Sequence, residues 1–156
     1  MFRPLKRIKQ QLSEDECKEI LLNEPRGVLS VIGDDNYPYA LPINFYYDAT
    51  ENKIYFHTGK EGHKLDSIKK NNKVSFCVYD KGFHKDNHWS LNIKSVIVFG
   101  KISITENWSR DMMVSFCKRF TDDIEYINSE IDKFQKNTIV MCLEIEHMTG
   151  KLVNEA

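Results

Sequence analysis

The residue types best suited to chemistry lie in residues 58–64, a polar loop that follows an apolar run. Thr58 supplies a hydroxyl, and Gly59 and Gly62 allow backbone amides to turn inward. The pattern predicts that a helix begins at Gly62, where unpaired amides attract anions, and Lys64 adds a full positive charge. These groups could hold a phosphate monoester, but the order is not that of a Walker motif. By themselves they fit a solvated turn with ordinary surface lysines better.

The strand-like run before this loop contains a proline in an unusual place. Pro42 lies within the largely apolar run 39–47, and Asn44 follows it two residues later. A proline removes one hydrogen-bond donor from a strand, so it indicates a sheet edge or a backbone that serves a ligand. A planar heterocycle with several carbonyl and amide positions could use such a backbone. The simpler alternative is an edge strand without a ligand.

Metal-binding patterns are weak. His57 and His63 are six residues apart across a glycine loop, with no cysteine or carboxylate pair nearby. His84 and His88 are four apart, but they lie in a loop rich in Gly, Asp and Asn, which predicts surface histidines. We therefore expect no metal site. No Ser-His-Asp or Cys-His order indicates a nucleophile either.

Composition excludes several classes of protein. The 156 residues fit one domain, residues 1–156, and 41% are apolar, enough for one core. A net charge of −1 argues against binding to nucleic acid or to a membrane surface through bulk charge. We also expect no signal peptide and no membrane span, because no long apolar run is present. The four cysteines show no zinc or redox spacing, which predicts buried free thiols in a reducing cytoplasm.

The elements that must position these residues are mostly strands. Ser13 predicts a capped first helix that Pro25 ends, and further helices are predicted over residues 62–71, 106–120 and 124–134. Gly100, in the middle of one strand, indicates a bulge or a close backbone approach. Short turns favour antiparallel pairing, so we expect a mainly β fold with peripheral helices that closes into a small barrel. The six predicted strands are residues 27–32, 39–47, 53–58, 74–79, 95–105 and 138–145.

Six short segments, in this order, resemble the FMN-binding split-barrel family related to pyridoxamine 5'-phosphate oxidase, and most closely its nitroimidazole-resistance proteins. The resemblance covers roughly residues 3–153, and its ordered set is more specific than any single segment. It implies a six-stranded antiparallel split β-barrel and a homodimer with FMN at the interface. The segments are GVLS (27–30), PYALPINF (38–45), IYFHT (54–58), EGHKLD (61–66), SVIVFGK (95–101) and TGK (149–151).

The resemblance also assigns roles to individual residues. The strand from Tyr39 to Asn44 would contact the flavin ring, largely through its backbone. His57, the candidate catalytic residue, and Thr58 would lie where the family contacts ring and phosphate, and Ser95, with Lys94 beside it, would reach the flavin of the partner subunit. The cofactor-binding set is Leu41, Pro42, Ile43, Asn44, His57, Thr58, His63, Lys64 and Ser95.

Three functions are open on these grounds. The leading one is an FMN-dependent oxidoreductase that reduces small nitroaromatic or nitroimidazole compounds. The alternative is a flavin- or haem-binding module without turnover, with His57, His84 and His88 as candidate haem ligands. Oxidation of pyridoxamine phosphate is disfavoured, because residues 149–156 contain no arginine.

Two aromatic features could serve either the cofactor or the core. Trp89 could cover the flavin or plug the base of the barrel. Trp108, Met112, Phe116 and Phe120 have helical spacing, which is typical of core or dimer packing rather than of a cofactor site.

Overall fold

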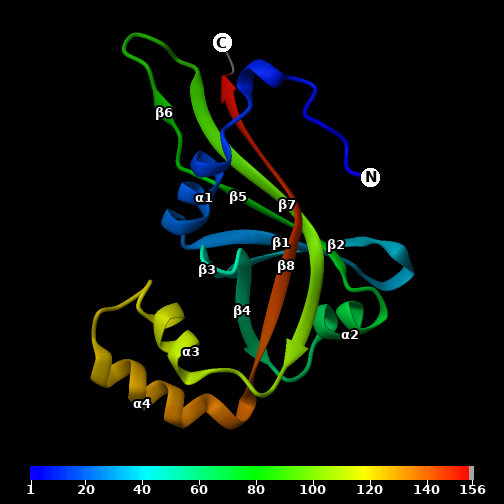
Figure 1. Cartoon of the computed structure of the whole chain (residues 1–156), viewed down its shortest axis with the longest axis vertical. Helices are drawn as coiled ribbons and strands as arrows, with labels where there is room; N and C mark the ends of the chain where they lie inside the picture. Colours follow the sequence, from blue (N-terminus) through cyan, green and yellow to red (C-terminus); the bar gives the residue numbers. More distant parts are fainter. Residues whose placement is uncertain (155–156) are drawn as a thin grey trace.

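Eight strands form one antiparallel sheet in the computed structural model, which describes residues 1–154 (Figure 1). The strands are Arg26–Ile32 (β1), Pro38–Asn44 (β2), Tyr46–Asp48 (β3), Lys53–Gly59 (β4), Lys73–Tyr79 (β5), Phe83–His84 (β6), Leu91–Thr105 (β7) and Thr138–Asn154 (β8). They pair in the order β2-β1-β5-β7-β8-β4-β3, and β6 pairs with β7. The predicted mainly β, antiparallel split barrel is confirmed.

The sheet curls into a barrel because its two edges belong to consecutive pieces of chain. β2 pairs with β1 at one edge, and β3 pairs with β4 at the other. Only Phe45 separates β2 from β3, so the two edges cannot lie apart. Phe45 is fully buried, and its ring meets that of Phe76 edge to face with centroids 5.0 Å apart. The predicted single strand 39–47 is therefore broken at this residue.

The other predicted strands are present, and two are longer than the pattern suggested. β7 begins at Leu91 and β8 continues to Asn154, where both strands extend beyond the barrel (Figure 1). The predicted bulge at Gly100 is confirmed, because the β7–β8 register shifts between Phe99 and Gly100. A side chain at Gly100 would collide with the carbonyl of Glu144, so only glycine permits this approach. The two-residue β6 was missed because it lies in the polar loop.

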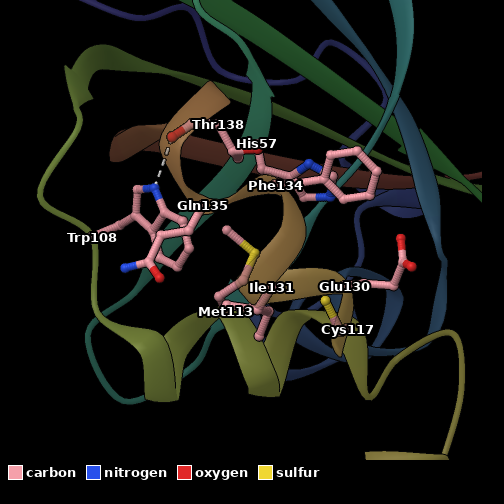
Figure 2. A pocket seen from close by; sticks show the side chains of 9 residues that line it. All are labelled: His57, Trp108, Met113, Cys117, Glu130, Ile131, Phe134, Gln135 and Thr138. Atoms are coloured by element: carbon pink, nitrogen blue, oxygen red, sulfur yellow. Dashed lines mark hydrogen bonds between the residues drawn. The ribbon is translucent and has the colours of Figure 1, made fainter. Parts of the chain in front are cut away.

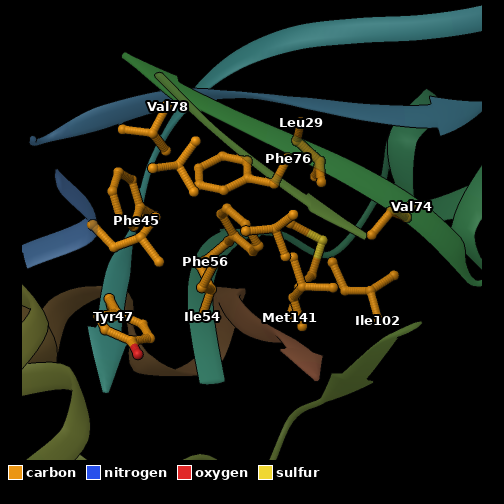
Figure 3. Packing of buried hydrophobic residues seen from close by; sticks show 14 of the residues in the cluster. Leu29, Phe45, Tyr47, Ile54, Phe56, Val74, Phe76, Val78, Ile102 and Met141 are labelled. Carbon is orange, nitrogen blue, oxygen red and sulfur yellow. The ribbon is translucent and has the colours of Figure 1, made fainter. Parts of the chain in front are cut away.

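The barrel is filled by alternate residues of its strands, as Figure 3 shows. Phe56 and Phe76 pack edge to face with centroids 5.0 Å apart. The alternate side chains of β1, β5 and β7 that do not face the core point out of the barrel. The fully buried side chains at the centre include Leu29, Phe45, Ile54, Phe56, Phe76, Met141 and Leu143.

The helices lie outside the barrel. They are Glu14–Asn23 (α1), His63–Lys70 (α2), Arg110–Cys117 (α3) and Ile124–Phe134 (α4), with 3-10 turns at Ile8–Gln10, Asp34–Asn36 and Gln135–Asn137. The predicted capping box of α1 is confirmed: the Ser13 amide donates to Glu16, and the Glu16 amide donates to Ser13. The α3 and α4 helices pack together below β4 and β8 (Figure 1).

None of the helices within residues 1–154 is long and apolar enough to span a membrane. All four thiols are free. Cys17 is buried as expected, whereas Cys77, Cys117 and Cys142 are half-buried.

Candidate functional site

The strand β2 has one open edge along its length. It pairs with β1 alone, and no other strand in the described part of the chain covers its far side. On an edge strand, every second residue turns its N–H and C=O away from the sheet. Pro42 is exposed, and Leu41, Ile43 and Asn44 are half-buried. The strand can therefore offer backbone groups to a ligand, as Pro42 indicated.

The loop after β4 leads into α2 with an open helix start. Gly62 has φ 143° and ψ 165°, a conformation that is essentially restricted to glycine, and no side chain caps the helix. The ammonium group of Lys64 has no carboxylate within ion-pair distance anywhere in residues 1–154. Within this loop, the backbone requires glycine at Gly62 but not at Gly59, whose φ is not positive. The arrangement leaves helix amides and one cation open to an anion.

His63 connects this helix start to the far end of β2. Its ring stacks on Tyr39 with centroids 4.3 Å apart. Its Nε2 atom lies 3.4 Å from the amide nitrogen of Asp34, which donates to it, and 3.7 Å from the Asp34 carboxylate. His63 thus already has polar neighbours, whereas Lys64 has none that neutralises it.

The two ends of β2 carry different chemistry. Tyr39 lies beside the α2 start, and Asn44 lies five residues further along, about 17 Å away at ~3.4 Å per residue. The site therefore has a cationic end and a strand-backbone end. Such a shape suits an extended ligand with one anionic and one planar end.

His57 lies at the Asn44 end of this site. Side chains alternate along β4, so His57 and Thr58 point to opposite faces of the strand. The His57 ring packs edge-on against Phe116 with centroids 4.7 Å apart. His57 is exposed, but its ring lies in a concave part of the surface. The partial loss of water there lowers the pKa of His57. The imidazole is therefore neutral near neutral pH.

A hollow of about 330 Å³ joins three of the predicted ring contacts to His57. Arg26 lines it too, and its Nε atom donates to the Asn44 side-chain oxygen over 2.7 Å. The sequence analysis missed Arg26. Arg26 is the partner of Asn44 in the β1–β2 hairpin, so the register of this hairpin would have indicated Arg26 as a site residue. The residues brought together here are Arg26, Pro42, Ile43, Asn44 and His57.

Two smaller hollows extend from His57 into the helical layer. One, of about 190 Å³, lies between α3, α4 and the end of β4 (Figure 2). The other, of about 150 Å³, shares His57, Cys117 and Glu130 with it and reaches Asn44.

Trp108 precedes α3 instead of lying in a helix over residues 106–120, because Ser109 caps α3. The predicted packing role of the stripe is confirmed for Phe116, Trp108 and Met112 in the helical core, but not for Phe120, which is 45% exposed.

Ser95 is not part of this cluster in its own chain. It lies on β7, which β5 and β1 separate from β2 in the sheet. A partner copy would have to bring it to the site, as the resemblance implies.

Trp89 is 81% exposed, so the suggestion that it plugs the barrel is wrong.

The middle of the outward face of β1, β5 and β7 carries apolar and small polar side chains, of which Ile97 and Phe99 are exposed and the others half-buried. One cross-strand row on it runs through Val28, Cys77, Ile97 and Thr149. Ile97 is 42% exposed at the centre of this row. We call the outward side chains Val28, Ser30, Ser75, Cys77, Ile97 and Phe99 the outer face. Part of it is covered by Phe2, which stacks on Phe99 with centroids 5.6 Å apart.

No group of three or more potential metal ligands occurs within the described range, residues 1–154. His84 lies in β6, and its Nδ1 atom is 3.1 Å from the Ser90 carbonyl oxygen.

Replacing Gly62 by alanine is expected to distort the start of α2. Its φ of 143° is a conformation that a Cβ atom makes unfavourable by about 1–3 kcal/mol, although open space surrounds the position. Chemical denaturation should show the loss in unfolding free energy. Gly59→Ala is the matched control, since a Cβ there also meets open space but the backbone is unstrained. Equal unfolding free energies for the two variants would contradict the requirement for glycine at position 62.

Comparison with known proteins identifies a family model and a set of similar structures. The family model described as pyridoxamine 5'-phosphate oxidase matches residues 13–152. No curated protein matches the chain significantly.

Three solved structures illustrate the shared fold. A candidate 5-nitroimidazole antibiotic resistance protein from Bacteroides thetaiotaomicron has 20% identity and a TM-score of 0.76, over 92% of this chain and 87% of that one. An FAD-binding protein from Mesorhizobium loti has 21% identity and a TM-score of 0.63, over 92% and 97%. An FAD and haem binding protein from Mycobacterium smegmatis has 18% identity and a TM-score of 0.74, over 94% and 74%. At these identities the matches show the fold alone.

Proposed function

Because the chain belongs to the pyridoxamine 5'-phosphate oxidase family, we propose that it binds FMN at a homodimer interface and reduces small nitroaromatic or nitroimidazole-type compounds. The observation that carries the proposal is the open edge of β2, which runs from the cationic start of α2 to the hollow at His57. The similar structure described as a candidate 5-nitroimidazole antibiotic resistance protein motivates the choice of substrate class.

The phosphate would bind where β4 leads into α2. The uncapped amides of α2, the Thr58 hydroxyl and the unpaired ammonium of Lys64 are the donors available there. Charge-assisted hydrogen bonds of this kind are about twice as strong as neutral ones. His63 stands beside them, stacked on Tyr39.

The ring would lie along the backbone of Leu41 to Asn44. Arg26 holds the Asn44 side chain by a 2.7 Å hydrogen bond, which fixes that end of the strand before any ligand arrives. When bound, FMN supplies the redox chemistry, so the protein has to hold the ring and admit a substrate. His57 would border the flavin ring as a neutral imidazole, which can accept a proton or donate a hydrogen bond at the substrate.

The second half of the site would come from another copy of the chain. The outer face exposes the apolar side chains of Ile97 and Phe99, and exposed apolar groups on a sheet can mark a contact surface. A groove of about 290 Å³ joins this face to β2 through Val28, Pro42 and Tyr79. A partner on the outer face would bring its Ser95 toward the flavin. The dimer would act in the cytoplasm.

The visible spectrum of the purified protein tests the proposal. Flavin absorption that bleaches when NADH, NADPH or a flavin-reducing partner is added supports an oxidoreductase. A colourless protein that also fails to bind added FMN contradicts the proposal.

Lys64→Ala is expected to weaken FMN binding by about 1–3 kcal/mol, or about 5- to 150-fold in the dissociation constant. The reason is the loss of the lysine in the first turn of α2, and a fluorescence titration with FMN measures the change. Lys69→Ala is the matched control, because Lys69 is exposed in the last turn of the same helix. Unchanged affinity in Lys64→Ala would remove Lys64 from the site.

A flavin- or haem-binding module without turnover is the second candidate. The similar structure of an FAD and haem binding protein motivates it. Bound flavin that no donor reduces, or a Soret band after incubation with haem, would favour this function. His57, His84 and His88 are then the ligands to replace.

A further inference from the structure

The hollow of about 190 Å³ between α3 and α4 has no role yet in binding the flavin. Met113 and Cys117 of α3 form one wall, and Ile131 and Phe134 of α4 form another. Figure 2 shows these side chains around the hollow, together with His57, Trp108, Glu130, Gln135 and Thr138. Its lining is therefore mostly apolar and carries a few polar groups at the margin.

The walls are held in place without a ligand. The Trp108 indole Nε1 atom donates to the Thr138 carbonyl over 2.9 Å, as Figure 2 shows. Met113 and Ile131 are buried in the packing between the two helices. A ligand that enters such a preformed apolar site needs little ordering of the protein.

The hollow communicates with the strand proposed to hold the flavin ring. His57 lines it and also lines the hollow formed by Arg26, Pro42 and Ile43. A third hollow shares His57 and Glu130 with the first and Asn44 with the second. A molecule between α3 and α4 would therefore lie beside the ring and not on a separate surface.

Charge limits what can bind there. Glu130 is the only carboxylate among the nine lining residues, and no lysine or arginine lines the hollow. Lys133, whose ammonium is 3.4 Å from Glu130, lies outside it and is exposed. An anionic ligand would lose water next to the Glu130 carboxylate, and the cation paired with that carboxylate, Lys133, lies in solvent outside the hollow where it cannot contact the ligand.

We propose that the hollow between α3 and α4 binds an uncharged, mostly apolar compound with one ring, and that Glu130 excludes anionic compounds of the same shape. The size agrees, because an apolar protein cavity of about 150 Å³ is large enough to hold benzene. As the position of the electron acceptor, this site rests on the proposed function. As a binding site, it stands on the geometry of α3 and α4.

Tryptophan fluorescence can test the site with or without flavin. Trp108 lines the hollow, and the other tryptophan, Trp89, is exposed and can be replaced in a Trp89→Phe variant. We expect nitrobenzene to quench Trp108 with a saturable curve. The anion 4-nitrobenzoate should bind at least about tenfold more weakly, because of its charge. N-acetyltryptophanamide corrects for absorption by the quenchers. A quenching curve that never saturates, or equal affinity for both probes, would overturn the proposal.

Glu130→Gln, in the Trp89→Phe background, separates charge from shape. It should strengthen 4-nitrobenzoate binding about 3- to 10-fold and leave nitrobenzene binding unchanged. Glu125→Gln is the matched control, because Glu125 is exposed on the same helix and does not line the hollow. No change in the ratio of the two affinities would remove Glu130 as the selective group.

The test also distinguishes this proposal from the proposed function. Saturable quenching in a protein that fails to bind FMN would leave the pocket standing without the oxidoreductase. FMN binding without saturable quenching would leave the flavoprotein standing without this pocket.

Discussion

Replacing Ile97 by glutamate is expected to turn an FMN-loaded dimer into a flavin-free monomer. Ile97 is 42% exposed at the centre of the outer face, in register with Cys77 on β5 and Thr149 on β8. In the proposed dimer this position would be dry, and an unpaired carboxylate would lose its water there. That desolvation costs several kcal/mol, so we expect the dimer to weaken by at least about 100-fold.

Sedimentation velocity and the absorbance of bound flavin measure the two consequences together. The barrel itself should stay folded, because the Ile97 side chain points away from the core. Ile8→Glu is the matched control, since Ile8 is also exposed but lies in the 3-10 turn Ile8–Gln10 and not on the outer face. An Ile97→Glu protein that stays dimeric and yellow would place the interface elsewhere.

Most of the fold follows from local sequence patterns. Strands β1, β5 and β7 alternate buried and open side chains, and Ser13 and Pro25 bound α1. The break at Phe45 does not follow, because the run 39–47 is apolar on both sides of Asn44 and shows no turn signal. Only closure of the barrel decides that this residue turns inward between two sheet edges. The late start of α3 was readable, since Ser109 accepts from the Met112 amide as an N-cap.

The candidate site divides in the same way. The helix start at Gly62 and Lys64 depends on neighbouring residues, and the sequence predicts it. Glu130 comes from a helix far along the chain, and no local pattern places its carboxylate near His57. Packing of the α3–α4 layer on β4 brings the two residues to the same hollow. The outer face depends on strand order, which one sequence does not determine.

Arg119 shows how far such tertiary contacts extend, and the sequence analysis did not single it out. Its guanidinium donates to the Phe45 and Glu24 carbonyl oxygens and to that of Leu22 over 3.2 Å. It also lies over the Phe45 ring, 4.7 Å from the centroid. One side chain therefore joins the end of α3, the end of α1 and the residue that closes the barrel. Phe45 follows Asn44, so the same contacts fix one end of the proposed flavin strand.

Arg119→Met is expected to lower the free energy of unfolding by about 3–5 kcal/mol. The substitution keeps much of the apolar stem but leaves the Phe45 and Glu24 carbonyls, both in part-buried hydrogen bonds, without their charged donor. Urea denaturation followed by circular dichroism measures the change, and Lys118→Met serves as control because Lys118 is exposed beside it. FMN affinity should fall as well, since β2 loses its anchor at Phe45. A loss below about 1 kcal/mol would mean that other contacts close the barrel, and that Arg119 is no more than a surface cation.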